Sequence, residues 1–125
     1  MDLYSGLPYW IIKNPLNNYF NPLAKDYTID VVIIGSGITG SLVAHELCEA
    51  GIKCAIIDKR TLSTGSSAAS TALLQYEIDV PLCEMVNMME ERLAVKAYEA
   101  CLQSISDFED VFKKVGYNPS FKNVS

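Results

Sequence analysis

Residues 29–58 read IDVVIIGSGITGSLVAHELCEAGIKCAIID, and this stretch decides the fold. Its first apolar run, at 28–34, is rich in β-branched residues and predicts a strand buried on both faces of a parallel sheet. A helical pattern follows at 38–50, and a second apolar run follows at 52–58. Strand, helix and strand in this order predict a parallel β-α-β unit.

Three glycines stand at the bend between the first strand and the helix: Gly35, Gly37 and Gly40. The first permits a sharp turn, the second lets a diphosphate approach the backbone, and the third lets the helix pack closely on the strand. The helix then begins with N–H groups and a dipole that favour negative charge. Asp58 ends the second strand, about twenty residues after the bend, where an acid can accept hydrogen bonds from a ribose. The pattern therefore predicts a dinucleotide site, and Asp58 argues against NADP because it would repel a 2′-phosphate.

Composition narrows the class of protein further. Half of the 125 residues are apolar, a fifth are charged, and the net charge is −5, without a basic stripe that would favour nucleic acid. A membrane-spanning helix needs about 20 consecutive apolar residues, and no run in the sequence approaches this length. The first residues lack a signal-peptide pattern. The four cysteines show no metal-ligand spacing, so we expect reduced thiols, no metal site and a cytoplasmic location.

The chain divides by pattern into four segments. Residues 1–27 form an irregular leader rich in aromatic residues, which either docks on the domain surface or binds a partner. Residues 28–79 hold the β-α-β unit and a loop of small residues. Residues 80–118 are helical, and 119–125 form a short polar tail. The single histidine, His45, lies within the first helical pattern, and we expect it to be a surface or packing residue.

Three stretches together resemble a known family, the FAD-dependent oxidoreductases related to D-amino acid oxidase, glycine oxidase and sarcosine oxidase. They are VVIIGSGITG at 31–40, IIDKR at 56–60 and GSSAASTALL at 65–74. The resemblance covers about residues 28–118. It implies an α/β fold consisting of a partial Rossmann-like FAD-binding β-α-β unit followed by two helices, with FAD as the cofactor.

The resemblance also implies roles for individual residues. The pyrophosphate would contact the bend at Gly35, Gly37, Gly40 and the backbone N–H groups of Ile38 and Thr39. Asp58 would bind the ribose, although the family more often has the longer glutamate at this position. The adenine would be flanked by Lys59 and Arg60. The flavin-side loop would be formed by Ser66, Ser67, Ser70, Leu73 and Leu74.

The expected activity is that of the family, oxidation of a small-molecule amine or amino acid. No residue of this chain is a candidate catalytic acid, base or nucleophile. Family members are much longer, so we interpret the chain as a truncated N-terminal FAD-binding part that lacks the catalytic domain and is inactive alone. A two-strand sheet keeps an unpaired edge, so we expect the isolated piece either to be marginally stable or to self-associate.

Two other functions remain open from the sequence. An NAD-binding domain of a dehydrogenase would share the bend and the acid, but its second strand would lead directly into another helix rather than into a loop of small residues. A non-catalytic interaction module with a nucleotide-binding shell would use the aromatic leader and the helical segment as docking surfaces. Flavin colour distinguishes the first alternative, and binding of a protein partner without flavin distinguishes the second.

Overall fold

The computed structural model describes residues 6–15, 19–119 and 121–122. Its contacts divide the chain into two compact units, residues 1–71 and 72–125. The elements of the first unit are α1 (Tyr9–Lys13), β1 (Val31–Ile34), α2 (Ile38–Glu49), β2 (Cys54–Ile57) and the 3₁₀ turn η1 (Ser66–Ala69). The second unit contains α3 (Leu82–Met85) and α4 (Glu91–Lys114). This order of elements confirms the predicted α/β fold, with two α-helices after the β-α-β unit.

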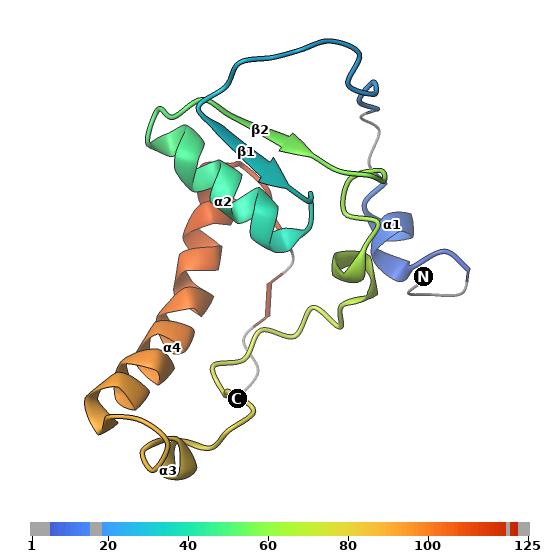
Figure 1. Cartoon of the computed structure of the whole chain (residues 1–125). Coiled ribbons are helices and arrows are strands. Elements are labelled where there is room, and N and C mark those ends of the chain that lie inside the picture. The colour runs from blue at the N-terminus through green and yellow to red at the C-terminus, as the bar shows by residue number, and fades with distance from the viewer. Residues whose placement is uncertain (1–5, 16–18, 120, 123–125) are drawn as a thin grey trace. The chain divides into compact units, whose positions relative to one another are not determined.

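The sheet of the first unit consists of β1 and β2 in parallel. The register pairs Val31 with Cys54 and Ile34 with Ile57, and the Gly35 N–H extends the ladder by donating to the Ile57 carbonyl at 2.8 Å. α2 connects the two strands in the sequence, and Figure 1 shows it lying along one face of the pair. The partial Rossmann-like unit is therefore present as predicted.

The two faces of β1 differ in burial. Val31 and Ile33 are half-buried, and a Cβ added at Gly40 of α2 would lie 3.3 Å from Ile33 Cγ2, so α2 covers this face. Val32 is 52% exposed and Ile34 is 85% exposed. The prediction of a strand buried on both faces is therefore wrong for this structure. A continuous apolar run indicates what a strand can bury, but only the packed neighbours decide what is buried.

Backbone hydrogen bonds explain where α2 ends. Gly51 has φ +73°, a left-handed conformation that suits glycine, and its N–H donates to the Cys48 carbonyl at 2.9 Å. The Ile52 N–H donates to the Leu47 carbonyl, also at 2.9 Å. This pair of bonds satisfies carbonyls that would otherwise have no partner in the last turn. α2 therefore ends at Glu49, just before this glycine and within one residue of the end of the helical pattern at 38–50.

The leader contains regular structure where the sequence predicts none. α1 follows Pro8, whose extended backbone and missing N–H suit the start of a helix. Within the first unit α1 packs against η1, which lies beside it in Figure 1. Trp10 of α1 contacts the loop of small residues through a hydrogen bond from its indole N–H to the Ser70 carbonyl.

The second unit is built around two buried side chains. Met85 of α3 is 8% exposed and Ala94 of α4 is fully buried, and the two helices pack against each other. The Tyr98 hydroxyl donates to the Val80 carbonyl at 2.8 Å and so fixes the segment before α3 to α4. Among the described residues, no helix combines the length and apolar character needed to cross a membrane.

Candidate functional site

The bend after β1 leads into the start of α2, where backbone N–H groups are left without backbone acceptors. Gly35 has φ +103°, a conformation that residues with a Cβ rarely adopt, and it turns the chain off the strand. Gly37 caps α2, and its own backbone is extended. The Ile38 N–H donates to Ser67 Oγ at 3.0 Å, whereas the N–H groups of Thr39 and Gly40 have no acceptor among the described residues. The start of α2 thus offers donors to an anion.

Two of the glycines are required by close approach rather than by φ. A Cβ at Gly40 would collide with the carbonyl oxygen of Gly35, so only glycine lets the helix lie this close to the bend. A Cβ at Gly37 would stand 3.1 Å from Ser67 Oγ and would fill the space in front of the α2 amides. A backbone without side chains, with donors left over, fits a diphosphate.

Asp58 is joined to the same bend. Its Oδ2 accepts hydrogen bonds from the Ser36 N–H and the Ser36 hydroxyl, both at 2.7 Å, and its Oδ1 accepts from the Arg60 N–H at 2.9 Å. The Ser36 donors, followed by the Arg60 N–H and the nearby Arg60 charge, lower the pKa of Asp58 to about 2. The side chain is therefore a carboxylate, and Oδ1 has a lone pair left for a ribose hydroxyl.

Ser36 links Asp58 to the bend and to Ser63, a role that its sequence motif did not predict. It is 2% exposed, the most buried polar residue among those described. Its hydroxyl accepts from the Ser63 N–H at 3.4 Å, and its carbonyl accepts from the Ser63 hydroxyl at 3.3 Å. Ser63 has φ +55°, which is strained for serine, and these bonds stabilise it there. The position of Ser36 between two glycines of the bend was the available signal, whereas nothing in the sequence indicated Ser63.

The other predicted residues of the first unit surround the bend to different degrees. Arg60 contributes its N–H to Asp58, and its guanidinium lies 3.7 Å from the position of a Cβ at Gly65. Lys59 and Ser66 are exposed. Ser67 reaches the start of α2, and Ser70 ends η1. Leu73 and Leu74 belong to the second unit and are therefore not among the residues that the first unit brings together.

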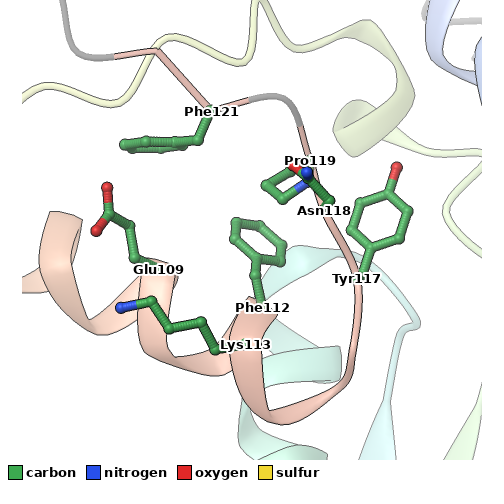
Figure 2. A pocket seen from close by; sticks show the side chains of 7 residues that line it. All are labelled: Glu109, Phe112, Lys113, Tyr117, Asn118, Pro119 and Phe121. Carbon is green, nitrogen blue, oxygen red and sulfur yellow. The ribbon is translucent and has the colours of Figure 1, made fainter.

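An open cavity of about 350 Å³ lies in the second unit, at the end of α4 (Figure 2). Phe112, Tyr117 and Phe121 supply most of its apolar wall, and Glu109 and Lys113 stand at its margin. No predicted site residue lines it. Among the residues that the structure describes, no three His, Cys, Asp or Glu side chains lie close enough together to hold a metal ion.

His45 and the four cysteines are not part of the hydrogen-bonded bend. His45 stands within α2, seven residues after its start, and its Nε2 is buried without a hydrogen-bond partner in the described part of the chain. All four cysteines are free thiols, and the sulfurs of Cys48 and Cys54 lie 3.9 Å apart. In the described part of the chain, none of these groups forms a hydrogen bond with Ser36 or Asp58.

Comparison with known proteins identifies the family. A family model described as FAD dependent oxidoreductase (DAO) matches residues 30–124. A Bacillus subtilis protein named as a Rieske 2Fe-2S iron-sulfur protein, YhfW, is 33% identical over 74% of this chain and 18% of its own length. An aerobic glycerol-3-phosphate dehydrogenase of Staphylococcus saprophyticus is 44% identical over 40% of this chain and 9% of its own length.

The same enzyme from Staphylococcus haemolyticus is 42% identical over 51% of this chain and 10% of its own length. The chain thus spans less than a fifth of the length of each of these relatives. No solved structure matches the chain. Because the family model covers most of the residues, including the whole β-α-β unit, the chain belongs to the FAD dependent oxidoreductase family, and its cofactor is FAD.

Proposed function

We propose that residues 30–72 hold the adenosine diphosphate half of FAD. The observation that carries this proposal is the attachment of Asp58 to the glycine bend through Ser36. Because Asp58 is hydrogen-bonded to Ser36, two residues before the first residue of α2, a ribose on Asp58 would place the diphosphate at the bend. In this arrangement Gly35 and Gly37 give backbone access, and the N–H groups of Thr39 and Gly40 bind the phosphate oxygens.

The loop after β2 completes the proposed site. Lys59 and Arg60 flank the adenine, and Ser66, Ser67 and Ser70 lie beside the diphosphate on the flavin side. Ser67 Oγ already occupies the hydrogen-bonding position at the Ile38 N–H, so it either adds a donor to the phosphate or gives up this N–H to it. Leu73 and Leu74 are proposed to contact the flavin ring, on the family resemblance alone.

For the whole protein we propose oxidation of an amine or amino acid, as in D-amino acid oxidase, glycine oxidase and sarcosine oxidase. The support is the resemblance of residues 65–74 to the flavin-side loop of that group. Bound flavin supplies the hydride acceptor, and the residues of this chain bind and orient it. Because the chain spans a small share of its relatives, we propose that the groups that bind substrate lie outside these residues. The proposed location is the cytoplasm.

A second substrate class is favoured by the comparisons. The staphylococcal relatives are named as glycerol-3-phosphate dehydrogenases, which makes a polyol phosphate an alternative substrate. The matched residues bind cofactor in our proposal and so do not distinguish the two classes. In a protein that contains these residues together with a substrate-binding part, loss of flavin colour on adding an amino acid, but not on adding glycerol 3-phosphate, would support the amine class. The reverse result would favour the second class.

Titration of the purified chain with four nucleotides tests the cofactor site. FAD and ADP should bind, because both carry the ribose and diphosphate, whereas FMN should not. NADP⁺ should bind more weakly than NAD⁺ because its 2′-phosphate meets the Asp58 carboxylate. Equal binding of FMN and FAD would contradict the proposal. Preference for NAD⁺ over FAD would favour the dehydrogenase alternative, and binding of none, together with capture of a protein partner, would favour the interaction module.

A pair of matched variants sharpens the titration. Asp58→Asn should weaken FAD binding by about tenfold to a hundredfold, the usual effect of losing a hydrogen bond to a charged group. Asp30→Asn makes the same chemical change just before β1, at the end of that strand that lies away from the bend. This control should leave FAD binding unchanged. Equal effects of the two variants would contradict a role for Asp58 in binding the ribose.

A further inference from the structure

The aromatic leader makes a specific contact with the loop of the proposed site. The indole Nε1 of Trp10 donates a hydrogen bond to the Ser70 carbonyl at 2.7 Å, across sixty residues of sequence. Trp10 is half-buried, and α1 packs against η1. α1 lies before residue 30, where the match to the family model begins, so neither the family model nor the glycine motif accounts for this contact.

The indole is held in place by its own neighbours. The rings of Tyr9 and Trp10 meet edge to face with centroids 4.9 Å apart. Lys13 Nζ lies 5.6 Å from the Trp10 centroid and 5.8 Å from the Tyr9 centroid, within the range of cation–π attraction. A donor fixed in this way can fix the carbonyl that it contacts.

The contacted turn leads directly to the bend. Ser70 ends η1, and its own N–H donates to the Ser67 carbonyl at 3.4 Å. Ser67 Oγ accepts from the Ile38 N–H at 3.0 Å, at the first residue of α2. The four-residue turn η1 is therefore contacted by Trp10 at its Ser70 end, and its Ser67 side chain contacts the start of α2. If the hydrogen bond from Trp10 is broken, the Ser70 end of the turn is no longer fixed. Ser67 is then no longer held at the start of α2.

We propose that Trp10 is a positioning residue that clamps η1 over the diphosphate site and so slows the loss of FAD. The inference rests on the proposed function, because it assigns the cofactor to this bend. Trp10 does not touch the reacting atoms in this account, and it acts through Ser70 and Ser67. In this proposal the leader is a functional part of the cofactor site and does more than dock on the domain surface.

The test compares two variants of one helix. Trp10→Phe removes the indole N–H and keeps an aromatic ring in contact with η1. Tyr9→Phe, the control, removes an exposed hydroxyl from the neighbouring residue. One neutral hydrogen bond corresponds to a change of about twofold to tenfold, so FAD should dissociate from Trp10→Phe faster by this factor. Tyr9→Phe should match the wild type.

Hydrogen exchange without FAD gives a second readout. The N–H groups of Ala68 and Ser70 are bonded within the turn, so both should exchange faster in Trp10→Phe. The Gly35 N–H, bonded to the Ile57 carbonyl, should exchange at the wild-type rate if the sheet is intact, which excludes unfolding as the cause.

The outcomes separate this inference from the proposed function. If the wild type binds FAD, and Trp10→Phe matches it in dissociation rate and in exchange, the role of Trp10 is overturned and the proposed site survives. Faster exchange in η1 with an unchanged dissociation rate also overturns the role, because the contact would then be structural only. If the wild type binds no FAD, the proposed function falls, and the cofactor role of Trp10 falls with it.

Discussion

The substitution Gly40→Ala tests the close approach of α2 to the bend. Gly40 is the third residue of α2, and at an unhindered helix position the change from glycine to alanine stabilises by about 1 kcal/mol. Here the new Cβ would collide with the Gly35 carbonyl oxygen and lie 3.3 Å from Ile33 Cγ2. The two effects oppose each other, so the sign of the result identifies the larger one.

The collision should win because its partner is backbone that cannot move freely. Overpacking of this kind costs about 1–3 kcal/mol, and sometimes more. Moving Gly35 would also weaken its N–H bond to the Ile57 carbonyl, which contributes about 0.5–1.5 kcal/mol. After the gain in helix propensity, we expect Gly40→Ala to lower the free energy of unfolding of the first unit by about 1–3 kcal/mol.

Urea denaturation followed by tryptophan fluorescence measures this directly. Trp10 is the single tryptophan of the chain and belongs to the first unit, so its emission reports that unit. Gly37→Ala is the matched control: its Cβ would meet only a hydroxyl, Ser67 Oγ at 3.1 Å, which can rotate away. The control should lose less stability than Gly40→Ala but bind FAD more weakly. A Gly40→Ala chain as stable as the wild type, or more stable, would refute the close approach.

Three further predictions concern single side chains. The pKa of Asp58 falls from 3.8 to about 2 on folding, so its contribution to stability is complete above pH 3.8 and is lost as pH falls toward 2. Urea midpoints of wild type and Asp58→Asn should therefore converge over this range, and a constant difference would argue against the Ser36 bonds. Burial, followed by the adjacent Cys48 thiol, raises the pKa of Cys54. Iodoacetamide should therefore label Cys54 more slowly than the exposed Cys83, as measured by mass spectrometry of a digest. Equal labelling rates would contradict this. Tyr98→Phe should cost the second unit about 0.5–1.5 kcal/mol by removing the bond to the Val80 carbonyl, measured by circular dichroism in urea, and no loss would contradict that bond.

The β-α-β unit could be predicted from the sequence because each of its features has a local physical cause. Gly51 ends α2 through its own positive φ, and Gly35 turns the chain for the same reason. These are properties of one residue and its immediate neighbours. The strand, the helix and the bend therefore appear in the structure in the order that the sequence predicts.

Contacts between distant residues could not be predicted in this way. The bonds of Ser36 to Asp58 and to Ser63 join positions 22 and 27 residues apart, and a serine between two glycines gives no sign of its partners. The contact of Trp10 with Ser70 is equally nonlocal, and an aromatic leader predicts docking without naming the surface. The exposure of Ile34 depends on which elements pack on the sheet, and a run of apolar residues does not specify them.

We propose above that the start of α2 and Asp58 bind one nucleotide. Amide chemical shifts of ¹⁵N-labelled chain, recorded with and without FAD and repeated with ADP, test it most directly. Both ligands should produce their largest shifts at Ile38, Thr39 and Gly40 and at the residues flanking Asp58. Shifts confined to the cavity at the end of α4, or shifts at the bend that leave the flank of Asp58 unchanged, would contradict it.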